Sequence, residues 1–185
     1  MNITSIFLIG IGLSMDAFAV SVAKGMCLAK EDVRKSALKL AIYFGFFQGL
    51  MPFIGWWVGS YFQELISSVD HWIAFILLGV IGGKMIYDAF HPETTECVPL
   101  TNKLVFLLAI ATSIDALAVG VSFAFLNVDI LSAVAIIGIT TFVLSFIATF
   151  LGNRLGCFLQ KYAELLGGSI LIIIGLKILV EHLLA

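Results

Sequence analysis

The sequence predicts an all-α integral membrane protein, with six transmembrane helices arranged as two inverted repeats of three helices. Composition supports the membrane class, because 61% of the 185 residues are apolar and only 12% are charged. Soluble domains hold about 45–50% apolar and about 25% charged residues. Since a helix that crosses the hydrocarbon core needs about 20 residues, the length accommodates about six spans in a single transmembrane domain over 1–185.

Long uncharged windows, separated by polar or charged links, mark the expected spans in order. Pro52 is expected to kink the second span, because its ring removes a backbone donor. The charged segment 24–39 is expected to be a solvated link between the first two spans. The six expected spans are 3–23, 40–62, 71–89, 104–125, 130–151 and 165–184.

Basic residues orient these spans. The links after the first, third and fifth spans contain Lys or Arg, whereas the N-terminus and the other two links contain none. Basic links favour the cytoplasm, so both termini are expected on the extracytoplasmic side. With 12 acidic and 10 basic residues, the chain has no basic excess that would suggest nucleic-acid binding.

The three cysteines, Cys27, Cys97 and Cys157, are scattered and never in a Cys-x-x-Cys spacing. Such a pattern predicts neither a disulfide framework nor a zinc site. We expect them to be small apolar residues or incidental thiols.

An internal repeat supports the two-unit arrangement, with repeat one at about 1–90 and repeat two at about 103–185. Residues 14–22 (SMDAFAVSV) match residues 113–121 (SIDALAVGV) at an offset of 99. Three spans per unit make the two units cross the membrane in opposite senses, as in many secondary transporters. Downstream the offset is 93, and the matched pairs are Gly45 with Gly138, Gln48 with Thr141, Gly59 with Gly152, Gly82 with Gly175, Lys84 with Lys177 and Asp88 with Glu181.

Asp16 and Asp115 are the carboxylates of the two matching motifs, and each lies in the middle of a span. An acid at that depth is costly and indicates a functional site. The pseudo-two-fold axis is expected to bring the pair together between the first and fourth spans. Two carboxylates in a dry site cannot both ionise cheaply, and a hard divalent cation such as Mg²⁺, Ca²⁺ or Mn²⁺ would relieve their repulsion.

Protons could replace the metal when it leaves, which predicts metal/proton exchange. The alternative for Asp16 and Asp115 is a protonated pair that is hydrogen-bonded between helices. Both interpretations place the two side chains at one interface.

Other polar residues of the spans allow two interpretations each. Ser14 and Ser113 are expected to donate to the carbonyls of Gly10 and Ala109, bending their helices, and direct ligation is the alternative. A second set could complete a ligand shell or hydrogen-bond between helices: Gln48, Thr140 and Thr141. The pairs Lys84/Asp88 and Lys177/Glu181 are either ion pairs with snorkelling lysines or gating salt bridges.

The runs SMDAFAVSVAKG at 14–25 and TSIDALAVGVSF at 112–123, with GGK at 82–84, carry a family resemblance. In them the chain resembles the MntP-type manganese efflux pumps, small six-span proteins of the bacterial inner membrane. The resemblance implies export of Mn²⁺ as a substrate, without a cofactor, by the intramembrane aspartates Asp16 and Asp115. Gly25 closes the first motif, but Ala124 stands in the second, so no symmetric role is expected there.

Two other functions stay open. Related six-span exporters carry other solutes, such as another divalent cation or an amino acid. Two Asp residues on separate spans can also form the dyad of an intramembrane aspartyl protease. Those proteases carry a GxGD run, whereas the matching positions here read LSMD and TSID, so we expect a transporter and not an enzyme, with the lipid bilayer and Mn²⁺ as its partners.

Overall fold

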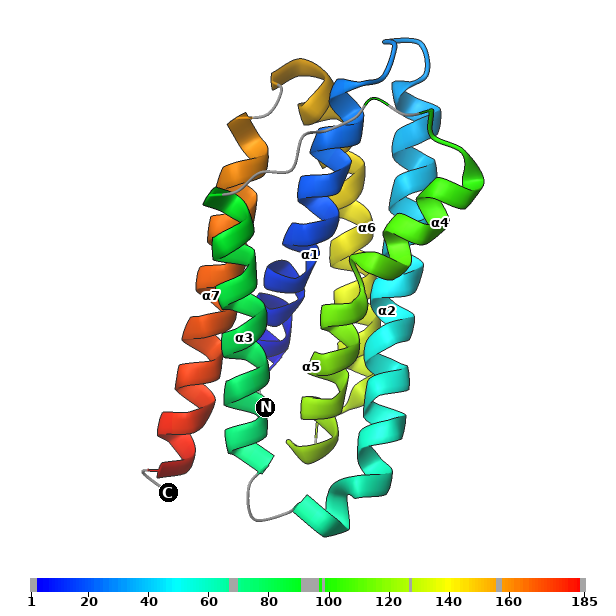
Figure 1. Cartoon of the computed structure of the whole chain (residues 1–185). Helices are drawn as coiled ribbons and strands as arrows, with labels where there is room; N and C mark the ends of the chain where they lie inside the picture. Colours follow the sequence, from blue (N-terminus) through cyan, green and yellow to red (C-terminus); the bar gives the residue numbers. More distant parts are fainter. Residues whose placement is uncertain are drawn as a thin grey trace.

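The computed structural model describes residues 3–66, 70–90, 97, 99–126, 128–155 and 158–183, and these residues contain no strand. Their helical character confirms the predicted all-α class. The helices are α1 (Ile3–Met26), α2 (Val33–Ile66), α3 (Asp70–Phe90), α4 (Asn102–Ala111), α5 (Ile114–Phe125), α6 (Ile130–Leu155) and α7 (Phe158–Leu183) (Figure 1).

The helices have the length and surface of membrane spans. Large apolar side chains are exposed on the outside of the bundle, including Val80, Leu131 and Ile173, and an apolar exterior of this kind suits lipid. Two shorter apolar helices cover Phe75–Tyr87 and Leu165–Val180. Four stretches of the described chain are long and apolar enough to cross a membrane: Ile3–Met26, Val33–Tyr61, Asn102–Phe125 and Ile130–Arg154.

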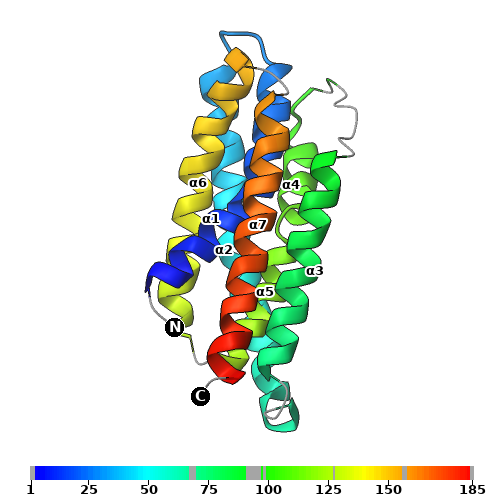
Figure 2. The same ribbon diagram turned by 90° about the vertical axis from the view of Figure 1, so that its left-hand side faces the viewer.

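Most of the packing joins the first half of the chain to the second half. α1 packs against α6 and α7, whereas α5 packs against α2 and α3. α2 also packs against α6, and α3 against α7. The bundle is elongated, and the N-terminal end of α1 and the C-terminal end of α7 lie toward the same end of it (Figures 1 and 2). The two halves therefore share one core.

The fourth span is not a continuous helix. α4 ends at Ala111 and α5 begins at Ile114, with Thr112 and Ser113 in a turn between them. The predicted span over 104–125 therefore consists of two helices, and the stretch Asn102–Phe125 is long and apolar enough to cross a membrane. The two half-helices still follow one another across the bundle (Figure 1), and the break lies directly before Asp115.

The link between α1 and α2 is shorter than predicted. α2 begins at Val33, so the last part of the charged segment 24–39 is helical. Lys39 of this helical part donates from Nζ to the carbonyl of Leu100 at 2.8 Å. α2 then continues through Pro52 to Ile66. The charged side chains of residues 30–32 and 34–35 are exposed, as expected of a solvated link, although the second helix begins earlier than the predicted span.

A disulfide joins Cys27 to Cys97, with 5.3 Å between their Cα atoms. The prediction of unpaired cysteines was wrong. Seventy residues separate the two cysteines, and the fold brings the end of α1 beside the segment before α4. Cys157 lies outside the described residues. Local spacing gives no signal for such a pair, since only the bundle determines which links meet.

Candidate functional site

Asp115 is presented by the broken span, in the first turn of α5. Its Oδ1 accepts a hydrogen bond from the amide of Ala116 at 2.8 Å. In an unbroken helix that amide would donate to the carbonyl of Thr112. The second oxygen, Oδ2, is buried and has no hydrogen-bond partner among the described residues. A buried acceptor without a donor is costly, so this oxygen is available to a ligand.

Asp16 lies in the middle of α1 and is half-buried. It is close enough to Asp115 for the two carboxylates to repel each other, and Lys84 of α3 attracts Asp115. α1 itself packs against α6 and α7 rather than extensively against α5. The two predicted acids therefore share one electrostatic environment. The side chains of Asp88 and Glu181, the predicted partners of Lys84 and Lys177, lie outside those that the structure describes.

Gln48 connects the break to α1. Its side chain is fully buried in α2. Its Nε2 donates to the Leu13 carbonyl at 3.0 Å, and its Oε1 accepts from Ser113 Oγ at 2.8 Å. The expected bond from Ser113 to the Ala109 carbonyl was wrong, because the amide oxygen of Gln48 takes this hydroxyl.

Thr112, rather than Ser113, donates its hydroxyl to the Ala109 carbonyl. Its Oγ1 donates to the carbonyls of Leu108 and Ala109 at 3.0 and 3.3 Å. Such side-chain bonds compete with the main-chain bonds of a helix. The main-chain pattern changes just after Thr112, because the Ser113 amide donates to the Ile110 carbonyl, three residues earlier, and the Ala116 amide donates to Asp115 Oδ1.

Ser14 occupies the matching position in α1. Its Oγ donates to the Gly10 carbonyl, which confirms the prediction. It also lies 2.7 Å from Thr141 Oγ1 on α6, and either hydroxyl can donate. Gln48 and Thr141 are therefore interhelical hydrogen-bonding groups at equivalent repeat positions, each contacting the motif serine of the other half.

A line of polar residues runs along α6 on the side that faces α1. Thr141, Ser145 and Thr149 are spaced by one helical turn and are fully buried. One turn further, Asn153 Nδ2 donates to the carbonyls of Gly25 and Leu28 at 3.2 and 2.8 Å. Of these residues only Thr141 was predicted as a candidate, although a polar residue at every fourth position of an apolar helix was a detectable signal.

Two hydroxyls in this interface lack a partner. Ser21 Oγ of α1 and Ser145 Oγ of α6 are buried and make no hydrogen bond within the described part of the chain. Their environment is the packed surface between α1 and α6. Together with Asp115 Oδ2, these two oxygens are the buried side-chain atoms without a hydrogen bond among the described residues.

The ligand set for a cation is limited. No group of three or more His, Cys, Asp or Glu side chains occurs in the ranges that the structure describes. A cation held by Asp16 and Asp115 would need further oxygens from hydroxyls, amides or main-chain carbonyls, which hard divalent ions accept.

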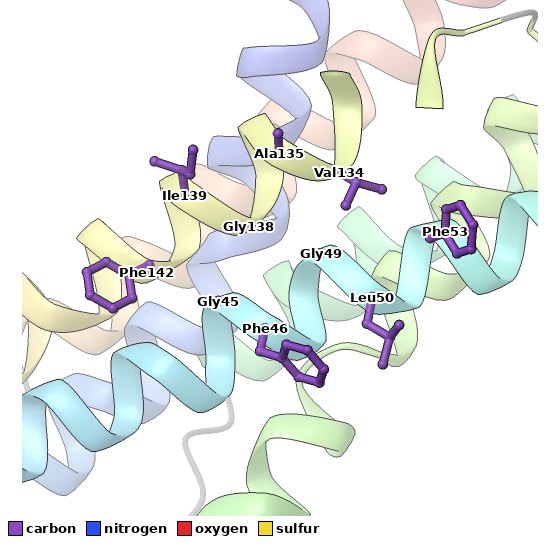
Figure 3. Close-up of a pocket in the computed structure, with 10 residues that line it drawn as sticks. All are labelled: Gly45, Phe46, Gly49, Leu50, Phe53, Val134, Ala135, Gly138, Ile139 and Phe142. Carbon is purple, nitrogen blue, oxygen red and sulfur yellow. The ribbon is translucent and has the colours of Figure 1, made fainter. Parts of the chain in front are cut away.

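The outer groove between α2 and α6 is not such a site. It has a volume of about 490 Å³ and is lined only by glycine and apolar side chains (Figure 3). Hard cations require oxygen ligands, so this surface suits lipid contact. Its lining residues are Gly45, Phe46, Gly49, Leu50, Phe53, Val134, Ala135, Gly138, Ile139 and Phe142.

Apolar spans, a helix broken beside a buried acid, and polar contacts between the two halves define a multi-pass membrane protein of the transporter class. The model of the family described as "Putative manganese efflux pump" matches residues 31–179. The chain belongs to this family, which confirms the resemblance seen in its two motifs.

Relatives cover the chain almost completely. A Clostridium perfringens protein named "Putative manganese efflux pump MntP" is 52% identical, over 98% of this chain and 96% of its own length. A protein of the same name from Methanosarcina mazei is also 52% identical, over 99% and 98% of the two chains. No solved structure matches the chain. The chain therefore spans the length of the relatives that carry the manganese efflux name.

Proposed function

We propose that this protein exports Mn²⁺ from the cytoplasm and binds it with Asp16 and Asp115. The observation that carries the proposal is the buried Asp115 Oδ2, which lacks a partner among the described residues and lies near a second carboxylate. One divalent cation balances both negative charges, and carboxylate oxygens suit Mn²⁺. The printed names of the relatives support manganese as the cargo.

Further oxygens for the cation are available at the break. The Thr112 carbonyl is one, because the Ala116 amide donates to Asp115 instead of to it. Carbonyls of broken helices coordinate cations in secondary transporters. The hydroxyls of Ser14 on α1 and Thr141 on α6 are two more candidate oxygens, and they lie 2.7 Å apart.

Coupling to protons follows from the same pair of acids. When Mn²⁺ leaves, Asp16 and Asp115 repel each other again, and binding of a proton relieves this repulsion. Lys84 offsets part of the charge on Asp115. We therefore propose exchange of Mn²⁺ for protons across the membrane.

The proposed architecture is a pair of inverted repeats, about 1–90 and about 103–185, in one domain of six spans. α4 and α5 together form the fourth span, and both termini are extracytoplasmic. Reciprocal packing supports this plan, since α1 packs against α6 and α7 of the second half, and α5 packs against α2 and α3 of the first half. The N-terminal end of α1 and the C-terminal end of α7 also lie toward one end of the bundle, as this plan requires (Figure 1).

The test is Mn²⁺ flux into proteoliposomes that contain the purified protein. Asp16→Asn and Asp115→Asn are each expected to lower the initial rate by about 100-fold, because each variant removes one charged oxygen ligand of the cation. Asp129→Asn is the matched control, since Asp129 is exposed at the start of α6. A wild-type rate in either buried variant would show that its carboxylate does not bind the cargo.

The same vesicles test the cargo. Counterflow with Mn²⁺, Cd²⁺ and basic amino acids separates the candidate substrates. Flux of amino acids without any metal flux would overturn the proposed function.

A further inference from the structure

We propose that Ser21 and Ser145 form a second, transient oxygen site for the divalent cation, between α1 and α6. This inference rests on the proposed function and extends it, because it adds a step between the aspartates and the cytoplasmic end of the bundle. The ligand is a partly hydrated divalent cation that exchanges water oxygens for hydroxyl oxygens.

The positions of the two serines follow from contacts on either side of them. Ser14 and Thr141 lie 2.7 Å apart on the side of the aspartate motif. On the other side, Gly25 packs directly on the main chain of Thr149. Ser145 lies midway between Thr141 and Thr149, one helical turn from each. Ser21 and Ser145 are thus in the stretch of the α1–α6 interface between these two contacts.

Both hydroxyls are unused, which is unusual for serines in helices. Each side chain is fully buried, and neither oxygen has a partner among the described residues. Three neighbouring hydroxyls donate to the carbonyl four residues earlier, in the way expected of helical Ser and Thr: those of Ser14, Thr141 and Thr149. Ser21 and Ser145 are the exceptions in this interface, and a guest with positive charge would use their lone pairs.

The other half of the protein has no such site at the matching level. The repeat offsets of 99 and 93 pair Ser21 with Gly120 and Ser145 with Pro52. There the main chains touch, because a Cβ atom added to Gly120 would overlap the carbonyl of Pro52. Helix packing in this fold therefore does not require hydroxyls at this level, and their presence on one side is specific to the α1–α6 interface.

The site is closed at the cytoplasmic end. Gly25 packs on Thr149, and Gly152 packs on the carbonyl of Val22. Asn153 adds hydrogen bonds to two carbonyls at the end of α1. A cation can reach the serines only when these contacts separate. Two neutral oxygens bind a cation weakly compared with two carboxylates, which suits passage toward Asp16 rather than retention.

The test separates the rate of passage from binding at the aspartates. The variants are Ser21→Ala, Ser145→Ala and the double variant. The control is Ser122→Ala, which removes a buried serine of α5 that donates to the Ala118 carbonyl at 3.4 Å. Mn²⁺ flux in proteoliposomes gives the rate, and Mn²⁺ electron paramagnetic resonance on the purified protein gives the affinity.

We expect the double variant to transport Mn²⁺ about tenfold more slowly, with its affinity unchanged and with Ser122→Ala like wild type. An unchanged rate would overturn the inference. A parallel loss of rate and affinity would also overturn it, because the serines would then act on the aspartate site or on the fold.

A second measurement decides the inference even if the wild-type protein moves no Mn²⁺, an outcome that would contradict the proposed function. Ser145→Cys is treated with a water-soluble cationic methanethiosulfonate, with and without Mn²⁺, and compared with the parent protein. Labelling that Mn²⁺ prevents supports the site. Labelling that Mn²⁺ does not change, or no labelling above the parent, overturns it.

Discussion

The α1–α6 interface and the α2–α5 interface occupy equivalent places in the two halves of the protein. Each has a polar pair at its centre, Ser14 with Thr141 in the first and Ser113 with Gln48 in the second. Beyond the centre they differ. In the α2–α5 interface the two main chains touch directly beside the centre. Gly120 packs on the carbonyl oxygen of Pro52, and Gly55 packs on the carbonyl oxygen of Leu117.

The α1–α6 interface is also packed, but hydroxyl side chains are buried beyond its centre. Between the Ser14–Thr141 pair and the contact of Gly25 with Thr149 lie the unused hydroxyls of Ser21 and Ser145. The same packing plan therefore supports an apolar seal in one half and an oxygen-lined stretch in the other. The two halves therefore differ in side-chain chemistry at this level.

The central pairs also differ in what they do to the backbone. α1 remains helical through Ser14, whereas the fourth span breaks at Ser113. The longer side chain of Gln48 reaches both Ser113 and the Leu13 carbonyl, and Thr141 is too short to do the same. Asp115 lies in the first turn of a helix, where main-chain amides stabilise negative charge, and Asp16 does not.

The largest effect on stability is expected from alanine at Gly152, in the α1–α6 interface. A Cβ atom there would overlap the Val22 carbonyl, so Gly152→Ala should destabilise the protein by about 3 kcal/mol. At the matched residue Gly59, an added Cβ atom would lie 3.0 Å from the Ala124 Cβ atom and 3.1 Å from the Val121 carbonyl oxygen. Gly59→Ala should therefore destabilise the protein by about 1 kcal/mol.

Thermal unfolding of the detergent-purified glycine variants measures this difference. Gly83→Ala is the control, because nothing lies within 4 Å of a Cβ atom at that position. It should not destabilise, since alanine favours a helix over glycine. Equal losses at Gly152 and Gly59 would show that the two interfaces are equally tight.

The Cys27–Cys97 disulfide is expected to stabilise the C-terminal end of α1, where Gly25 also packs on Thr149 of α6. Cys27→Ser should lower the free energy of unfolding by about 2 kcal/mol, because the open chain gains conformational entropy when unfolded. Cys97→Ser should give the same loss, and the double variant should lose no more than either single variant. Non-reducing and reducing gels of the wild type check the bond directly, and additive losses would contradict it.

A smaller effect is expected from the central polar pairs. Gln48→Leu should cost about 2 kcal/mol or less, because it leaves the Ser113 hydroxyl without its buried acceptor. Thr141→Val should cost about 1 kcal/mol, since Ser14 keeps its bond to the Gly10 carbonyl. Unfolding of the two variants measures both losses, and a greater loss for Thr141→Val would reverse the order of the two centres.

Much of the protein follows from its sequence. Composition is enough for the membrane class, because a chain with this apolar content cannot hide its side chains from water in so few residues. The doubled motif identified Asp16 and Asp115 as a pair and carried the resemblance to the manganese efflux family. Each copy of the motif is a continuous segment of the chain, so both inferences could be made without the structure. Their role as the cargo site remains a proposal.

Only the tertiary structure decided the features that depend on distant partners. The hydrogen bond at the break, from the Ser113 hydroxyl to Gln48 Oε1, joins two residues that are 65 apart in the chain. The Cys27–Cys97 bond likewise depends on which links meet at one end of the bundle. Hydropathy and spacing report on local segments, whereas the free energy of a buried polar group is set by the side chain that packs against it.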